Sequence, residues 1–468
     1  MPGSIVIIGA GSAMFTQGLV ADLIQDGREW DLRLVDTDPV ALDVASLLAR
    51  RMVVEKQVPI TVRASLDRRE LLPDAGVVVT TIAVGGRRAW ETDVFVPRRF
   101  GIFQPVGDSV SVGGILRAMR MVPAMVAIAQ DVVDLCPNAL FINYSNPMSV
   151  TCRAIHRATQ ANVIGLCHGV NHVQGYLASL IDAPRSQTSA IAVGVNHLTW
   201  FTEFRWRGQD AWPLVRHEIE GRSQEAVEAS SLGQAFAEAG SQWAEACRAD
   251  NPFSWELFQT FGAFPAVLDR HVTEFFPAML RENAYYGKTL GVDAFSLEAV
   301  TAHGDEIFAR MLARARGDEP IPEGLFRRQE GEHEQLLDIL RALGDDRPFL
   351  FSMNLPNKGQ VSNLPADAIL ESPTLVTAGT IRPLTLGPVP TGPAAILKRV
   401  IAVQELTVEA ALTQDRELLV QALVADGAVR SPSEANRLLA EMARETSGRP
   451  WLSRTKSWMF DVPQSAAA

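Results

Sequence analysis

The sequence predicts an α/β protein in which a Rossmann-type, doubly wound parallel sheet is followed by an α+β domain. Short strand patterns alternate with helical patterns over the first 180 residues, a rhythm typical of parallel sheets with right-handed crossovers. The first strand pattern ends in a glycine-rich turn that opens a helix. Beyond residue 180, two adjacent strand patterns and then long helical stretches replace this rhythm. We therefore expect two domains, residues 1–180 and residues 181–468.

The first domain is predicted from short apolar runs and the helical patterns between them. The predicted strands are Ser4–Gly9, Leu32–Asp36, Ile60–Ala64, Val77–Ala83, Ala139–Asn143 and Val163–Cys167. Apolar residues recur at helical spacing in Gly11–Asp26, Val40–Lys56, Ala118–Val133 and Val150–Thr159. This order of elements predicts a mainly parallel sheet with helices on both faces.

The second domain has a different pattern. Ala190–Asn196 and Leu198–Trp206 predict two strands of a separate, antiparallel sheet. Long helical stretches follow at Ala226–Arg248, Pro277–Lys288, Asp305–Arg316, His333–Leu343 and Pro393–Gln414. A segment spaced by Pro and Gly, Asn354–Pro390, interrupts them. We assign this domain to substrate binding and oligomerisation.

Composition limits the class of protein. The chain has 468 residues, with 43 Lys or Arg and 54 Asp or Glu, so its formal net charge is −11. We expect neither nucleic acid nor a membrane surface as a partner of so acidic a chain. We find no signal peptide pattern and no apolar run suited to a membrane span. The four cysteines lack zinc or disulfide spacing, which favours free thiols and a cytoplasmic protein: Cys136, Cys152, Cys167 and Cys247.

The turn after the first predicted strand has features of a dinucleotide site. Gly9 and Gly11 allow backbone N–H groups to approach a pyrophosphate at the start of a helix, with Ser12 beside them. The third glycine of the usual fingerprint is absent. Asp36 ends the second strand 25 residues after Gly11, where a carboxylate accepts from ribose hydroxyls and favours NAD over NADP. The alternative is a plain strand-to-helix turn with a helix-capping Asp.

Polar side chains also follow the later strands of this sheet. Asn146 comes after one strand, Cys167 and His168 end the next, and His197 ends the strand after that. A thiolate and an imidazole can share a divalent metal, but a spacing of 30 residues between Cys167 and His197 matches no standard zinc motif. The alternative is a buried Cys and a hydrogen-bonded core His.

Six motifs in order, from residue 9 to about residue 365, carry a resemblance to a known family. They are GAGS-x-x-F, NYSNP, GLCHG, GVNH-L-x-W, DRHVTEFFP and NLPNKGQVSNLP. Together they resemble glycoside hydrolase family 4, whose members are NAD- and manganese-dependent and do not use the two-carboxylate mechanism. The motifs are closer to the α-galactosidase and α-galacturonidase branch, or to the sister NAD-dependent sulfoquinovosidases, than to the 6-phosphoglucosidases. The implied architecture is similar to that of malate dehydrogenase.

The resemblance implies a redox-assisted elimination. NAD oxidises the C3 hydroxyl of the sugar to a ketone, which acidifies the C2 proton; a base removes that proton, and the aglycone leaves from C1. Water then adds and NADH reduces C3 again, so there is no net hydride transfer. A divalent metal, Mn²⁺ in this family, polarises the ketone and stabilises the enediolate.

The resemblance also implies roles for individual residues. Gly9, Gly11, Ser12, Phe15 and Asp36 would bind NAD, and Cys167 and His197 would be the metal ligands. Asn146 would bind sugar hydroxyls, or alternatively cap the following helix. His168 would be the acid that assists aglycone departure. Asp269 corresponds to the C2 base of the α-acting branch, with Tyr285 or Tyr286 as substitutes and an ion pair as the alternative. His271 is a further ligand, a partner of one, or a core His.

Other candidates concern the sugar. Asp108, in Val106–Ser109, resembles part of the family's loop over substrate and nicotinamide, with an Asx-turn as the alternative. Asn357, with Lys358 and Gln360 nearby, would reach the sugar from the second domain, or else form a surface loop. Arg87 and Arg88 are adjacent, whereas family members carry one cation there. Arginine forks suit carboxylate, phosphate or sulfonate, so they favour an anionic sugar, a uronide or a sulfoquinovoside. They could instead contact NAD phosphates or another subunit.

The predicted activity is therefore cleavage of an α-glycoside of an unphosphorylated hexose, most plausibly anionic. Two other classes of function stay open at this point. A malate- or lactate-type dehydrogenase would release NADH stoichiometrically and would not need Cys167. A non-enzymatic NAD-sensing regulator would keep the Gly9–Asp36 site and tolerate loss of the metal pair. Family members are usually oligomers, so we expect a homodimer or homotetramer.

Overall fold

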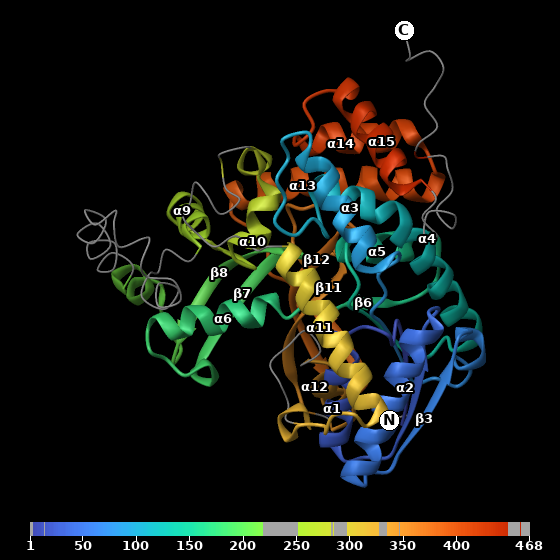
Figure 1. Ribbon diagram of the computed structural model, residues 1–468. Coiled ribbons are helices and arrows are strands. Elements are labelled where there is room, and N and C mark those ends of the chain that lie inside the picture. The colour runs from blue at the N-terminus through green and yellow to red at the C-terminus, as the bar shows by residue number, and fades with distance from the viewer. Residues whose placement is uncertain are drawn as a thin grey trace, which may run out of the picture.

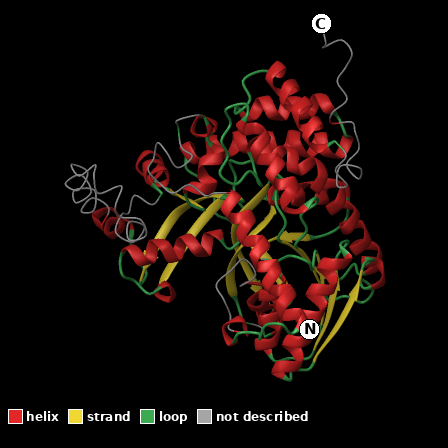
Figure 2. Cartoon of the chain, in the orientation of Figure 1, coloured by secondary structure: helices red, strands yellow, loops and turns green. Residues whose placement is uncertain are grey.

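The computed structural model describes residues 3–13, 15–218, 251–281, 284, 297–326, 335–345, 347–447 and 459, and the structural statements below concern these residues. Their strands form one sheet with the order β10-β8-β7-β12-β11-β6-β5-β4-β1-β2-β3, and β9 and β13 pair with β8 and β12 (Figure 1). Figure 2 shows the strands running through the molecule with helices around them.

The first half of the sheet is parallel and has the strand order 3-2-1-4-5-6 of a Rossmann fold. Its strands are β1 (Ser4–Ile8), β2 (Trp30–Val35), β3 (Ile60–Ser65), β4 (Val77–Thr80), β5 (Leu140–Asn143) and β6 (Val163–Gly165). The helices between and after them are α1 (Thr16–Asp26), α2 (Pro39–Lys56), α3 (Gly86–Arg98), α4 (Ser111–Leu135), α5 (Met148–Ala158) and α6 (Gly169–Leu180). The predicted fold class is confirmed.

Alternate residues of β1 explain why the sheet is covered on both faces. Ile5 and Ile7 are buried in one apolar cluster with residues of α1, α2, α11 and α12. Val6 and Ile8 point to the other face, where they join a cluster with residues of α4 and α5. Because successive strand residues face opposite ways, a continuous apolar run is the pattern of a strand buried on both sides.

The prediction of a separate second sheet was wrong. β7 (Thr188–Val195) and β8 (Leu198–Trp206) form the predicted antiparallel hairpin. However, β11 (Phe349–Pro356) and β12 (Ile369–Thr377) lie between β6 and β7 and join the hairpin to the parallel sheet. β12 comes from the Pro- and Gly-spaced segment Asn354–Pro390, and β11 begins before that segment and ends inside it. The predicted boundary at residue 180 stays a prediction.

The remaining strands are β9 (Gln209–Asp210), β10 (Phe264–Ala266) and β13 (Thr380–Pro383). The remaining helices are α9 (Pro252–Phe261), α10 (Asp269–Val272), α11 (Leu297–Arg316), α12 (Gln335–Gly344), α13 (Thr391–Thr413), α14 (Arg416–Asp426) and α15 (Pro432–Thr446). The helix predicted at 226–248 lies outside the described residues. Of the helix predicted at 277–288, the structure describes a short 3-10 turn, Pro277–Leu280.

Helix α4 is, within the described part of the chain, the one helix long and apolar enough to cross a membrane, with a mean hydropathy of 1.5. It is a core helix instead, because 78% of that stretch is buried inside the protein. One side of α4 packs on the parallel sheet, and the other packs on α13, α14 and α15. Its apolar composition therefore follows from contact with protein on both sides.

Candidate active site

The turn after β1 is shaped as a cradle for a ligand. Gly9 has φ +95°, and a Cβ on it would lie 2.8 Å from the backbone of Thr81. A Cβ on Gly11 would lie 2.5 Å from Ala41 Cβ and 2.9 Å from Asp36 Oδ2. The Gly11 N–H donates to Asp36 Oδ2 at 2.8 Å. The two glycines thus let the backbone pass close to the sheet edge, with a carboxylate beside it, as a dinucleotide requires.

Ser12 and Phe15 complete this turn. The Ser12 N–H donates to the Gly9 carbonyl, and α1 begins directly after Phe15. The Phe15 ring lies 5.5 Å from the ring of Tyr144, which follows β5. Phe15 therefore connects the turn to the carboxyl end of the neighbouring part of the sheet, where ligands bind in doubly wound folds. The five predicted dinucleotide-binding residues lie together around this turn.

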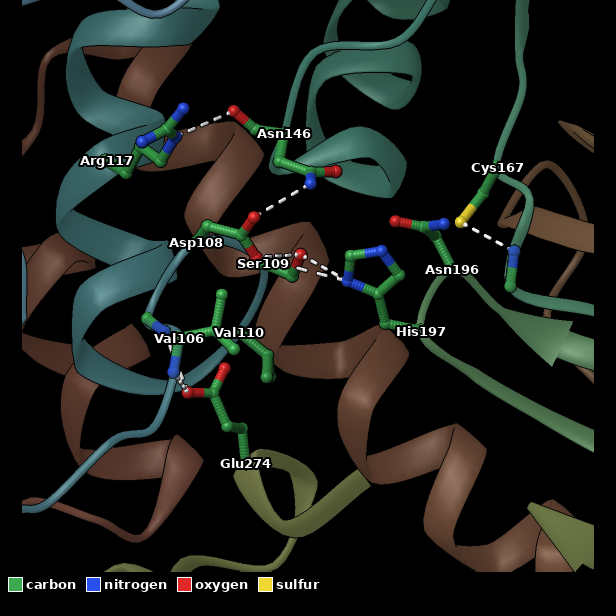
Figure 3. A network of polar contacts seen from close by, with 12 residues as sticks. Val106, Asp108, Ser109, Val110, Arg117, Asn146, Cys167, Asn196, His197 and Glu274 are labelled. Carbon is green, nitrogen blue, oxygen red and sulfur yellow. Dashed lines mark hydrogen bonds and ion pairs between the residues drawn. The ribbon is translucent and has the colours of Figure 1, made fainter. Parts of the chain in front are cut away.

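A second group of polar residues forms a cluster of possible metal ligands. Asp108, His197 and His271 each offer one atom, and these atoms all lie within 4.8 Å of one another. The His197 and His271 rings are 4.1 Å apart between centroids. Ser109 Oγ contacts His197 Nδ1 at 2.9 Å (Figure 3). The predicted ligand His197 thus has a carboxylate and a second imidazole beside it.

Asn146 joins this cluster through Asp108. Its Nδ2 donates to Asp108 Oδ2 at 2.9 Å, and its backbone carbonyl accepts from Arg117 Nε at 3.0 Å (Figure 3). Arg117 is buried, and it lies close enough to Asp108 for the carboxylate to affect its pKa. Burial lowers the pKa of Arg117, while Asp108 opposes that shift. A guanidinium, a carboxylate and a carboxamide therefore lie side by side.

Cys167 and His168 lie between β6 and α6, and Asn196 and His197 lie between β7 and β8. In Figure 3 the Cys167 thiol is on the same side as the Asn196 carboxamide and the His197 ring. Cys167 is buried, and its Sγ accepts from the Gly169 N–H at 3.4 Å. His168 lies close enough to His271 to contribute to lowering the pKa of that imidazole. His168 thus lies near the cluster, whereas Cys167 is not one of the three residues whose ligand atoms lie within 4.8 Å of one another.

The electrostatics of the cluster suit a metal cation. Burial lowers the pKa of both His197 and His271, so each imidazole is neutral near pH 7 and keeps a lone pair for a metal. His271 Nδ1, Asn146 Oδ1 and Asn196 Oδ1 are buried and have no hydrogen-bond partner within the described residues. Buried polar atoms without partners indicate a missing ion, water or ligand. The imidazole, thiol and oxygen donors fit a divalent transition metal.

Sequence reasoning missed Glu274, which holds the loop that carries Asp108. Glu274 is buried, and its Oε1 accepts from the N–H groups of Val106 and Gly107 at 2.7 Å each (Figure 3). Burial raises its pKa well above the usual value, and Asp108 adds to that shift. Glu274 stands three residues after His271 in the motif DRHVTEFFP, so its place in that motif could have marked it as a candidate site residue.

Two predicted sugar-binding cations are engaged elsewhere. Arg87 Nε donates to Asp305 Oδ1 at 3.0 Å, and Arg88 Nη2 contacts Asp305 Oδ2 at 3.3 Å. Arg88 also pairs with Glu91. The two ion pairs with Asp305 are exposed and join α3 to α11. The structure therefore does not bring the two arginines to the cluster, and their contact with a sugar stays a prediction.

Asp269 and Asn357 are used in local structure. The Asp269 carboxylate accepts from the N–H groups of Phe253 and Ser254 and from the Ser254 hydroxyl, at the start of α9. Asn357 makes hydrogen bonds to Val361 and to two further backbone groups of its own loop. Asp269 is thus a helix-capping residue in this structure, and its role as base stays a prediction, as does sugar binding by Asn357. Tyr285 and Tyr286 lie outside the described residues.

Comparison with known proteins identifies the family. The model of the family 4 glycosyl hydrolases matches residues 4–183, and that of their C-terminal domain matches residues 192–429. The chain belongs to the family 4 glycosyl hydrolases. An α-galacturonidase of Bacillus subtilis is 30% identical over 94% of this chain and 96% of that protein. An α-galactosidase of Rhizobium meliloti is 30% identical over 94% of this chain and 87% of that protein.

Solved structures share the fold of this chain. A Bacillus subtilis protein described as a glucosidase has a TM-score of 0.77 and 29% identity, covering 94% of this chain and 99% of that one. A 6-phospho-α-glucosidase from gut microorganisms, solved with NAD and glucose-6-phosphate, has a TM-score of 0.79 and 21% identity, covering 95% of this chain and 98% of that one. The family predicted from the six motifs is confirmed, and the chain is a glycoside hydrolase.

Proposed function

We propose that this chain is an NAD- and Mn²⁺-dependent glycosidase that cleaves an α-glycoside of an unphosphorylated, anionic hexose. The observation that carries the proposal is the cluster of Asp108, His197 and His271 with Asn146 at its side. The glycine cradle after β1 supports NAD binding, because its shape and the adjacent Asp36 suit a dinucleotide. A structural relative, a 6-phospho-α-glucosidase, was solved with NAD and Mn²⁺.

The residues of the cluster have separable tasks. NAD would accept and return a hydride, and a divalent metal would polarise oxygens of the sugar. His197 and Cys167 would hold the metal, with His271 and Asp108 as further donors. Asn146 would orient a sugar hydroxyl, because its Nδ2 is fixed by Asp108 and its Oδ1 has no partner among the described residues. His168 would protonate the leaving aglycone.

The anionic sugar is supported by relatives and by charge. Four of the similar curated proteins are α-galacturonidases, whose name implies a carboxylate-bearing sugar. Arg117 offers a buried cation beside Asn146 and Asp108. A guanidinium in that position suits a carboxylate or a sulfonate. Arg87 and Arg88 are the predicted alternative, at the cost of their ion pairs with Asp305.

A panel of p-nitrophenyl α-glycosides with NAD and Mn²⁺ tests the substrate. We expect turnover of the galacturonide, with the sulfoquinovoside and the galactoside as the next candidates. Omitting either NAD or Mn²⁺ should remove turnover. In deuterium oxide the C2 proton should exchange with solvent, while NADH stays at a low steady level. Activity confined to 6-phosphosugars would contradict the proposal, as would NADH release in proportion to product.

Replacing Asp36 should change cofactor selection. Its carboxylate accepts from the Gly11 and Asp38 N–H groups, and in this proposal it also accepts from ribose hydroxyls. Asp36→Ser removes the negative charge that repels a 2′-phosphate, so we expect NAD to bind roughly tenfold more weakly and discrimination against NADP to be lost. Titration calorimetry with both cofactors measures this. Asp36→Asn, which keeps the size of the side chain, is the matched control for folding. An unchanged NAD/NADP ratio in both variants would refute the assignment.

A cytoplasmic location and a homodimeric or homotetrameric state are part of the proposal. The free, buried thiols of Cys136 and Cys152 support a reducing compartment. Light scattering of the purified chain measures its mass, and a monomer at working concentration would exclude the oligomer.

A further inference from the structure

Four residues form a row across the middle of the sheet, close to the candidate active site. Gly165 on β6 pairs with Asn354 on β11, Asn354 pairs with Glu371 on β12, and Glu371 pairs with Gly194 on β7. A Cβ on Gly165 would lie 2.9 Å from Asn354 Cβ, so glycine permits this close approach. The predicted metal ligand Cys167 follows Gly165 by two residues, and the predicted ligand His197 follows Gly194 by three. The row thus connects the two strands that carry them.

Glu371 is a buried acid inside this row. Its side chain is 1% exposed, and its Oε1 accepts from Ser352 Oγ at 3.2 Å. Its Oε2 accepts from Asn196 Nδ2 at 3.3 Å, and Asn354 also hydrogen-bonds to the carboxyl. Burial raises the pKa of Glu371 to about 7, and these three hydrogen bonds oppose that rise. Burying a carboxyl group among neutral partners costs folding free energy, so we expect Glu371 to have a function.

The hydrogen bond that Asn196 Nδ2 donates to Glu371 fixes the direction of the Asn196 carboxamide. A carboxamide carries its donor and acceptor on opposite sides, so anchoring Nδ2 turns Oδ1 away from Glu371. Asn196 Oδ1 is buried and has no hydrogen-bond partner among the described residues. His197 has φ +66°, which breaks the alternation of an extended strand, and Asn196 and His197 both face the cluster (Figure 3).

Asn146 repeats this arrangement on the opposite side. Its Nδ2 is held by Asp108, and its Oδ1 is likewise buried and without a partner in the described residues. Figure 3 shows the Asn146 and Asn196 carboxamides turned toward the same space above His197. Two acceptors, each anchored by a carboxylate, therefore face a space that holds no donor for them among the described side chains.

We propose that Glu371 is a positioning residue that holds the Asn196 carboxamide with Oδ1 facing the candidate active site, where this oxygen accepts a hydrogen bond from an O–H group. The donor is a hydroxyl of the bound sugar or a water molecule on the metal ion. A buried acceptor without a donor is unfavourable, so the site is complete only when that donor is bound. The inference rests on the proposed function for the identity of the donor.

The test uses the full chain with NAD and two probes, Mn²⁺ and D-galacturonate. Asn196→Ala removes the acceptor, whereas Glu371→Gln introduces a donor that lets the Asn196 carboxamide turn its nitrogen to the site. We expect each variant to weaken binding of at least one probe by about tenfold. The double variant should bind no more weakly than Asn196→Ala, because both act through one contact. Ser352→Ala, which removes a hydrogen bond to Glu371 that does not involve Asn196, is the control and should change binding less than about twofold.

The two probes separate the sources of the O–H group. Weaker Mn²⁺ binding without sugar, measured by electron paramagnetic resonance, identifies the metal-bound water. Unchanged Mn²⁺ binding with weaker D-galacturonate binding, measured by calorimetry, identifies the sugar hydroxyl. Wild-type binding in both single variants, or additive losses in the double variant, would overturn this inference but not the proposed function. A wild-type chain that binds neither probe would overturn the proposed function and this inference with it. Asn196→Ala keeps Glu371 and its hydrogen bond from Ser352, so it tests the acceptor even if Glu371→Gln fails to fold.

Discussion

Replacing His197 by alanine is expected to remove Mn²⁺ binding and to lower turnover by about 10³-fold or more, because a metal ion in such a site supplies several kcal/mol of charge stabilisation. His197 is buried beside Ser109, Asp108 and His271, so the alanine variant loses an imidazole donor from within the cluster. NAD binding should persist, since the glycine cradle lies on a different turn. Electron paramagnetic resonance of bound Mn²⁺, NAD titration and steady-state turnover measure the three effects.

Cys167→Ser extends this prediction to the thiol. We expect a loss of Mn²⁺ affinity and of turnover in the same direction, with the fold kept, because serine is close in size to cysteine. Cys136→Ser is the matched control: its thiol is also buried, but Cys136 follows α4 and precedes the amino end of β5, away from the carboxyl ends of the strands. That variant should keep wild-type turnover. Full activity of Cys167→Ser would mean that the thiol is not a metal ligand, and the predicted ligands would then be the two imidazoles and Asp108.

The parallel half of the fold could be predicted because its signals are local. The runs around β1 and β2, and the turn at Gly9 and Gly11, are each readable within a few residues. β11 and β12 could not be placed in the same way, because their positions depend on pairing with strands far away in the sequence. Helix α15 was missed although a local signal existed at its start. Ser431 Oγ accepts from the Glu434 N–H, and the Glu434 carboxylate accepts from the Arg430 N–H.

The candidate site was partly predictable for the same reason. Asn146, Cys167 and His197 could be grouped because they follow strands that end at one edge of a sheet. The motif DRHVTEFFP predicted Asp269 as the base and left His271 as a further ligand, a partner of one or a core His. The two stand two residues apart in the helical turn α10, which separates their side chains by about 200°. His271 faces the cluster, so Asp269 faces α9, and only the three-dimensional structure reveals which of the two points inward.

Breaking the buried ion pair between Asp93 and Arg120 is expected to have the largest effect on stability. Asp93 on α3 and Arg120 on α4 are both buried, and the two guanidinium nitrogens donate to the two carboxylate oxygens. Arg120 Nε also donates to the Val84 carbonyl at 2.9 Å, which fixes the chain between β4 and α3. Asp93→Ala leaves a buried charge without its counter-charge, and we expect the free energy of unfolding to fall by about 3–5 kcal/mol. The midpoint of urea unfolding measures this.

Asp305→Ala is the matched control for that loss. Its carboxylate pairs with Arg87 and Arg88 at the surface, where water screens the charges, so removing it should cost less than about 1 kcal/mol. Adding Arg120→Met to Asp93→Ala should restore much of the lost stability, since no unpaired charge remains buried. Equal losses for Asp93→Ala and Asp305→Ala would mean that burial of the ion pair does not decide its contribution. The contact between α3 and α4 would then depend on apolar packing alone.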